Sequence, residues 1–136
     1  MSPYKKAYMQ YMDSQGVKYL DKDEHVVRVS YSGDNLNTIP VYVFFDQDGD
    51  GIATFRCWDI VKIPEDKMAK ALITCNEMNK RFRWVKFYVD KDRDIMAEMD
   101  AVVDMQTVGA ECVQLVKRTV NIVDDAYPEF MRVVWG

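Results

Sequence analysis

The sequence predicts an α+β fold in which the elements follow the order αβββαββα and form a single domain over residues 1–136. Two observations carry this prediction. Segments in which apolar and polar side chains alternate, the pattern of strands, recur between polar turns. Segments with apolar side chains at three- and four-residue spacing, the pattern of amphipathic helices, occur at both ends and near the middle. The chain has the length of one domain and contains no linker, repeat or low-complexity tract.

The fold is organised around residues 64–90, which read PEDKMAKALITCNEMNKRFRWVKFYVD. Pro64 suits the first turn of a helix, where its missing N–H is no loss. One apolar stripe follows, formed by Met68, Ala71, Leu72, Cys75, Met78 and Phe82. At Arg83 the period changes to two, which predicts a strand entered with almost no loop. We expect this helix to pack its stripe across the sheet that the strand joins.

The segments before this centre predict one helix and three strands. Ser2 and Pro3 form a helix start, and Gly16 is a natural stop. The stripe of this helix consists of Tyr4, Tyr8, Tyr11 and Met12. Strands are predicted at 25–31, 40–45 and 52–60. The strand at 40–45 is apolar at nearly every position, so we expect it to be central and covered on both faces.

The segments after the centre predict one strand and the last helix. Residues 95–101 alternate and follow the polar turn at 90–94. Asp104 is expected to be the N-cap of the final helix. Pro128 interrupts the apolar stripe of that helix, so we expect a kink or a short second helix over 129–135.

Composition and charge exclude several classes of partner. The chain is 49% hydrophobic and 29% charged, which is typical of a soluble globular protein. The net charge of −4 favours neither nucleic-acid phosphate nor an anionic membrane surface. No apolar run approaches the roughly 20 residues that span a bilayer, and the first residues lack the apolar core of a secretory signal. Cys57, Cys75 and Cys112 are widely spaced, so we expect buried free thiols in a cytoplasmic protein.

Residues 46–51, DQDGDG, resemble the start of an EF-hand calcium loop. Asp46, Asp48 and Asp50 supply the first three oxygen ligands, and Gly51 permits the sharp turn. The twelfth position must supply a bidentate carboxylate, but it is Cys57. Both flanks read as strands instead of helices. We therefore interpret the segment as a polar hairpin turn, and we expect no metal or other cofactor.

The sequence contains no constellation of catalytic residues. His25 is the only histidine, and we expect it to be exposed at the start of a strand. The sequence therefore offers no Ser–His or Cys–His pair built on a second histidine. It also offers no zinc cluster of several histidines. The glycine-rich phosphate-binding motifs are absent from the sequence. The adjacent Asp124 and Asp125 are expected to be surface charges. These observations predict a protein that is not an enzyme.

Five residues are candidates for a partner or ligand surface: Trp58, Asn76, Asn79, Trp84 and Trp135. Tryptophan is over-represented at protein interfaces, but it is also a common core residue. Asparagine is a mediocre helix former, so Asn76 and Asn79 are expected either to bond a neighbouring loop or strand edge or to contact a ligand.

Two longer segments are similar to the YbjN-domain family of bacterial proteins. They are FFDQDGDGIATFRCWDIVKIPEDKMAKALITCNEMNKRFRWVKFYVDKDRDI and NIVDDAYPEF, and the similarity covers nearly the whole chain. The resemblance implies a fold like that of type III secretion chaperones, which is a twisted antiparallel sheet with helices packed on it, often dimeric. It implies a regulatory role without an established activity. Secretion chaperones bind extended segments of client proteins without catalysis.

These observations lead to two hypotheses of function. The first is a cytoplasmic adaptor, chaperone-like or regulatory, that binds a polypeptide client and forms a homodimer. The abundance of aromatic side chains and the nine methionines favour this reading, since Met suits adaptable apolar surfaces. The alternative is a sensor that binds a small molecule or ion between helix and sheet, near Trp58, Asn76, Asn79 and Trp84.

Overall fold

A computed structural model describes residues 1–46 and 49–136 of the chain. The elements are α1 (Pro3–Gln15), β1 (Leu20–Asp21), β2 (Val26–Tyr31), β3 (Ile39–Phe45), β4 (Ile52–Cys57), the 3₁₀ turn η1 (Glu65–Lys67), α2 (Met68–Arg81), β5 (Lys86–Val89), β6 (Ile95–Val102) and α3 (Val108–Trp135). The predicted α+β fold is confirmed. The predicted order is also confirmed, with the addition of the two-residue β1 and the turn η1.

The six strands form one sheet in the order β1-β2-β3-β4-β6-β5, and every pair of neighbours is antiparallel. Hairpins join β2 to β3, β3 to β4, and β5 to β6. The chain leaves the sheet after β4, forms α2, and returns as β5 at the far edge, so that β6 lies between β4 and β5. The antiparallel sheet expected from the family resemblance is confirmed.

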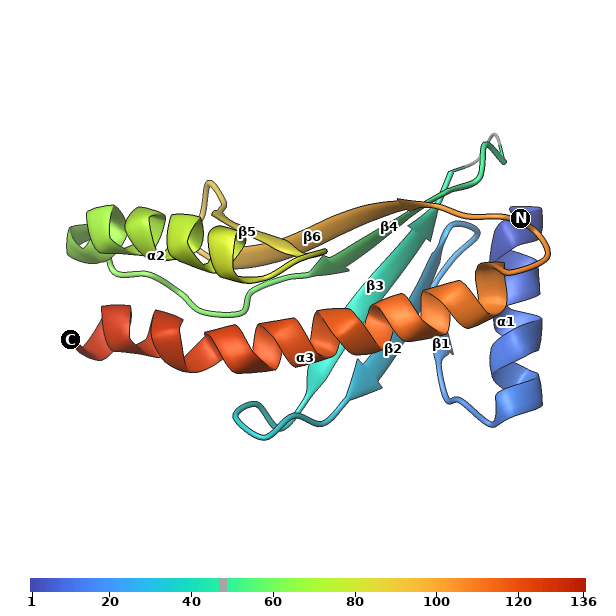
Figure 1. The fold of residues 1–136 in the computed structure, drawn as a ribbon, viewed down its shortest axis with the longest axis horizontal. Coiled ribbons are helices and arrows are strands. Elements are labelled where there is room, and N and C mark those ends of the chain that lie inside the picture. The colour runs from blue at the N-terminus through green and yellow to red at the C-terminus, as the bar shows by residue number, and fades with distance from the viewer. Residues whose placement is uncertain (47–48) are drawn as a thin grey trace.

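The three helices lie together on one side of the sheet (Figure 1). The long helix α3 runs across the sheet and contacts β2, β3 and β4. Helix α1 crosses the N-terminal end of α3, whereas α2 lies beside its C-terminal half and also packs on β5. The opposite face of the sheet carries no helix in the part of the chain that the structure describes.

The core lies between the sheet and α3. In β3, Ile39, Val41, Val43 and Phe45 point to this side and are at most 2% exposed. The intervening Tyr42 and Phe44 are half-buried on the opposite face. The expectation that this strand is covered on both faces is therefore wrong. Aromatic side chains shield the second face from solvent in place of another helix.

The predicted boundaries of α1 are confirmed. The Ser2 hydroxyl accepts a hydrogen bond from the Tyr4 backbone N–H at 3.2 Å, and Gly16 ends the helix in the left-handed region at φ 69°. The stripe predicted for α2 is partly wrong. Ala71, Cys75 and Met78 are buried, but Leu72 is 56% exposed and lies on the other side of the helix.

The start and the course of α3 differ from the prediction. The N-cap is Thr107, because Asp104 instead closes the preceding turn by accepting the Gln106 backbone N–H at 2.8 Å. The helix continues through Pro128 to Trp135, so a separate second helix is wrong. Pro128 cannot donate to the Asp124 carbonyl four residues earlier. The Asn35 side-chain amide donates to that carbonyl at 3.0 Å and replaces the missing hydrogen bond.

Candidate functional site

The candidate site lies where β6 extends beyond its neighbour β5. On one side β4 accompanies β6 as far as the pair Ile52 and Val102. On the other side β5 accompanies it only as far as the pair Lys86 and Glu98. Val103 donates its backbone N–H to Gly51 at 2.7 Å, on the β4 side. Because backbone groups alternate between the two sides of a strand, those of Asp100 and Val102 point to the side that β5 leaves open.

A groove of about 490 Å³ lies beside this open edge, between β6 and α3. The strand contributes residues 99–102, and Leu115 and Arg118 come from the helix. The Val102 side chain is 82% exposed, although valine is usually a core residue. The site therefore combines unpaired backbone donors and acceptors with an exposed apolar surface, which is the arrangement that an added strand requires.

Trp84 also lines the groove. It is 51% exposed and adopts φ 73°, a backbone conformation that is an outlier for a bulky residue. The Arg118 guanidinium lies over the indole ring, 5.4 Å from its centroid, and links the ring to α3. The Val85 backbone N–H donates to the Arg83 carbonyl at 2.8 Å in a tight turn. This turn joins α2 to β5, so β5 begins too late to cover the rest of β6.

Asn79 has a structural role. Its side chain accepts the Phe87 backbone N–H at 2.7 Å and donates to the Phe87 carbonyl at 3.0 Å. Since β5 is an edge strand, the backbone groups of Phe87 that point away from β6 need such a partner. The interpretation that Asn79 bonds a strand edge is supported. Asn76 lies one turn earlier on α2 and is exposed.

The tryptophan residues lie on separate surfaces. The Trp58 ring stacks on Tyr42 with a centroid distance of 4.5 Å and meets the edge of Phe44 at 5.8 Å, on the face of the sheet without helices. Trp135 is 80% exposed at the end of α3. Only Trp84 lines the groove along β6. The five candidate residues therefore do not converge on one pocket, which weighs against the sensor hypothesis.

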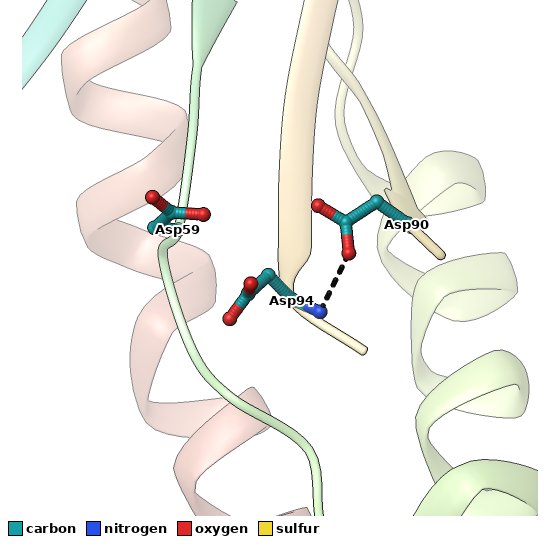
Figure 2. Close-up of side chains that lie close together, drawn as sticks. All are labelled: Asp59, Asp90 and Asp94. Carbon is teal, nitrogen blue, oxygen red and sulfur yellow. Dashed lines mark hydrogen bonds between the residues drawn. The ribbon is translucent and has the colours of Figure 1, made fainter. Parts of the chain in front are cut away.

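Three carboxylates converge where β4 and β5 end and β6 begins, with oxygen atoms within 4.8 Å of one another: Asp59, Asp90 and Asp94 (Figure 2). Asp90 Oδ1 accepts the backbone N–H groups of Asp92 and Asp94, each at 2.9 Å. The Lys62 ammonium lies 3.2 Å from Asp94 Oδ2 and balances part of the charge. These bonds confirm the polar turn predicted at 90–94, and they account for the positions of Asp90 and Asp94 within it.

The loop at 46–51 joins two strands, β3 and β4, as its interpretation as a hairpin turn requires. Gly49 and Gly51 adopt φ 67° and 78°, which glycine permits without strain. Asp48, the second potential calcium ligand, lies outside the described residues.

His25 is half-buried, so the expectation that it is exposed is wrong. Its backbone N–H donates to Asp23 Oδ1 at 2.7 Å.

Sequence analysis missed the most extensively bonded carboxylate of the described chain. Asp124 is 6% exposed and accepts the backbone N–H groups of Asp34, Asn35 and Leu36 at 2.8–3.0 Å. Burial opposes its charge, but these three hydrogen bonds outweigh that effect and lower the pKa of the carboxyl group. The expectation of a surface charge is wrong for Asp124, whereas Asp125 is exposed. The turn formers at 32–35 were the only signal that a loop needed such an anchor.

The cysteines are buried free thiols, as predicted. Burial raises the pKa to about 12 for Cys57 and Cys112 and to about 11 for Cys75. A thiol with so high a pKa is a poor nucleophile at neutral pH, since the thiolate is the reactive form. The three cysteines therefore contribute packing to the core.

Comparison with known proteins assigns the family. The family model of YbjN, described as "Putative bacterial sensory transduction regulator", matches residues 9–132. The chain belongs to the YbjN family. The resemblance expected from the sequence is thereby confirmed. No curated protein matches the chain in sequence.

Two solved structures share the fold. The crystal structure of YbjN from E. coli, described as "a putative transcription regulator", is 10% identical, with a TM-score of 0.64 and coverage of 91% of each chain. A chain of the heterodimeric ExoU–SpcU complex from the type III secretion system of Pseudomonas aeruginosa is 11% identical, with a TM-score of 0.57. That match covers 92% of this chain and 95% of the other. At such identities the likeness shows the fold alone.

In the described part of this chain, no helix has the length and apolar character needed to cross a membrane.

Proposed function

We propose that this protein is a non-enzymatic cytoplasmic adaptor that binds an extended segment of another polypeptide along the open edge of β6. The segment pairs with the backbone of Asp100 and Val102, and its side chains enter the groove beside Trp84. The observation that carries the proposal is the coincidence of unpaired strand edge and groove. The ExoU–SpcU complex, in which two polypeptides associate, supports a protein partner by analogy of fold.

Binding of a peptide requires both the open edge of β6 and the groove beside it. Asp100 and Val102 offer two backbone donors and two acceptors, each worth about 1 kcal/mol net when bonded. Their sum of about 4 kcal/mol corresponds to a Kd near 1 mM. Contacts in the groove must supply about 4 kcal/mol more to reach a Kd near 1 μM. A client is therefore an extended segment with an apolar side chain at the position that faces Trp84 and Leu115.

The cytoplasmic location and the homodimer belong to the same proposal. Buried, unpaired thiols in a chain of this size support a reducing compartment. The homodimer follows from a second exposed apolar surface, on α2.

Selection from a displayed library of random 12-residue peptides tests the proposal, with affinities then measured by fluorescence anisotropy on synthetic peptides. Val102→Pro removes the N–H that faces the open edge but leaves the hydrogen bonds to β4 unchanged. We expect it to weaken the selected peptides at least tenfold. Val102→Thr is the matched control, because it retains the N–H and the β-branched shape, and it should change affinity less than threefold.

A second variant tests the groove. Trp84→Gly removes the ring and relieves the positive φ, so the fold is retained while the apolar contact is lost. We expect at least a tenfold loss of peptide affinity. The proposal is wrong if no peptide is selected, or if the selected peptides bind Val102→Pro and Trp84→Gly as tightly as the unmodified protein.

A further inference from the structure

Three adjoining hollows cross the surface from the middle of α3 to the edge of the sheet at β1. The first, of about 480 Å³, lies where α1 crosses α3. The second, of about 360 Å³, lies between the end of α1, the end of β2 and α3. The third, of about 210 Å³, lies over β1 and β2. Lys117 lines the first two hollows and Lys18 the last two, so together they form one surface, the basic furrow.

The basic furrow carries positive charge alone. It is lined by four basic side chains and by no carboxylate: Lys18, Arg28, Lys117 and Arg118. Among the described residues, none of these four forms an ion pair. The chain as a whole has a net charge of −4, so its charges are segregated and not evenly mixed. A surface of this kind attracts an anionic partner.

The carboxylates nearest to these lysines in sequence have other partners. Asp13 accepts the Tyr19 hydroxyl at 2.8 Å, and Asp21 accepts the Lys5 ammonium at 2.5 Å. On α3, Glu111 accepts the Thr107 hydroxyl. The protein therefore does not neutralise the furrow with its own acidic side chains.

The basic furrow adjoins the groove along β6. Gln114 and Arg118 line both the groove and the first hollow of the furrow. An extended segment that pairs with β6 and leaves the groove across α3 passes directly onto the positive surface. This continuity favours a polypeptide over a nucleic acid, because the open edge of β6 recognises a polypeptide backbone. A nucleic acid would also bring one charge per nucleotide to a protein that is negative overall.

We propose that the basic furrow binds an acidic stretch of the client, a run of Asp and Glu residues next to the segment that pairs with β6. The proposal rests on the proposed function and adds a second recognition element to the client. It also gives the client a direction. Only one orientation along β6 places the acidic stretch over the furrow, so charge complementarity selects that orientation.

Extended peptides test the proposal. A 12-residue peptide from the displayed library is synthesised with four Glu, four Gln or four Lys residues added at either end. At 50 mM NaCl we expect four Glu at one end to tighten binding about tenfold, four Gln to change it less than twofold, and four Lys to weaken it. The net charge of −4 by itself would produce the reverse order. At 500 mM NaCl the gain from Glu should fall below threefold, because salt screens exposed charges.

A charge reversal locates the contact. Lys117 is exposed and lies at the centre of the furrow, so Lys117→Glu reverses its charge without disturbing the core. We expect the gain from four Glu to fall below threefold in this variant, while the unextended peptide binds as before. Lys91→Glu is the matched control, because Lys91 is also exposed but lies in the turn at 90–94, and it should keep the tenfold gain.

A probe without a strand segment tests the furrow by itself. In an NMR titration of the full chain with hexaglutamate, the largest shifts of backbone amides are expected at 16–18, 30–31 and 114–118. Hexaglutamine should produce none. A 12-residue oligothymidylate is titrated under the same conditions. If it binds the furrow more tightly than the Glu-extended peptide does, the partner is a nucleic acid and the proposal is wrong.

The outcomes separate this proposal from the proposed function. Equal affinities of the Glu- and Gln-extended peptides, or an undiminished gain in Lys117→Glu, overturn the acidic stretch, whereas the adaptor proposal stands if the unextended peptide binds along β6. If the library yields no peptide, the adaptor proposal fails and hexaglutamate decides the furrow. Shifts confined to other residues, or no shifts, then overturn it.

Discussion

Two buried charged side chains each tie a helix to a loop beside the sheet. Asp124 on α3 accepts three backbone N–H groups from the loop between β2 and β3, and Lys5 on α1 reaches Asp21 and the Asp23 carbonyl beside β1. Both residues belong to types that are rarely buried unless they are paired. Each bridges segments far apart in sequence, so each fixes the position of a helix on the sheet.

Asp124→Asn is expected to lower the free energy of unfolding by about 1.5–3 kcal/mol, because an amide cannot accept all three hydrogen bonds that the carboxylate accepts. Urea denaturation at pH 7 measures the change. Asp125→Asn is the control, since Asp125 is exposed, and it should change stability by less than about 0.5 kcal/mol. Equal effects of the two substitutions would contradict the anchoring role.

The same carboxyl group makes stability depend on pH. Its pKa is lowered in the folded state relative to the unfolded value near 4. The stability that it contributes is therefore fully present above that unfolded value and is lost as the pH falls through the folded pKa. The loss of stability between pH 5 and pH 2 should be smaller in Asp124→Asn than in the unmodified protein.

Lys5 and Asp21 are expected to respond asymmetrically to substitution. The Lys5 side chain is fully buried, whereas that of Asp21 is 49% exposed and lies 2.5 Å from the ammonium. Asp21→Ala leaves a buried charge with only a carbonyl partner and should cost about 3 kcal/mol. Lys5→Met fills the same space without a charge and should cost less than 1 kcal/mol. Thermal and urea unfolding measure both variants, and a larger loss for Lys5→Met would show that the ion pair itself stabilises the fold.

At the scale of elements, periodicity predicted most helices and strands because one side of nearly every element faces the same core. Alternation located β2, β4 and β6, an apolar run located β3, and the change of period at Arg83 located the entry to β5. It could not locate β1, because two exposed residues carry no pattern. In α2 the apolar residues of the inner and outer sides merged into one stripe, so Leu72 was assigned to the wrong side.

The course of α3 depended on a contact that no local pattern contains. Pro128 was expected to kink the helix or to start a short second one, because it leaves the Asp124 carbonyl without its usual donor. Asn35, 89 positions away in sequence, supplies the donor.

The candidate site could not be predicted from a local sequence pattern either. Trp84 was singled out from the sequence, but the open edge of β6 depends on where β5 begins, which is decided by tertiary packing.

The crossing of α1 and α3 is set by one glycine. A Cβ atom at Gly109 would lie 2.3 Å from the Tyr11 Cβ, which no side-chain rotation can relieve. In an isolated helix Gly→Ala stabilises by roughly 1 kcal/mol. Here Gly109→Ala should instead destabilise the protein by about 1–3 kcal/mol because the helices must separate. Chemical denaturation measures the sign, and a stabilising effect would show that α1 can move aside freely.

At the scale of the whole molecule, two exposed apolar surfaces are proposed to bind different partners. The edge of β6 offers backbone groups to an extended chain, whereas the outer side of α2 offers the exposed apolar side chains of Leu72 and Ile73. If α2 forms the homodimer, folding and association are linked, because a partner that binds only the folded state stabilises it by mass action. Thermal stability then becomes a test of assembly that needs no client.

We expect the melting temperature to rise with protein concentration. For a dimer that unfolds to separated chains, a hundredfold increase in concentration should raise the free energy of unfolding by about 2.7 kcal/mol per dimer, a shift of several degrees for chains of this size. Differential scanning calorimetry at 2 and 200 μM measures it. In Ile73→Glu the melting temperature should be the same at both concentrations, because the dissociated chain has no partner to lose. A shift of equal size in the variant would place the association on a surface other than α2.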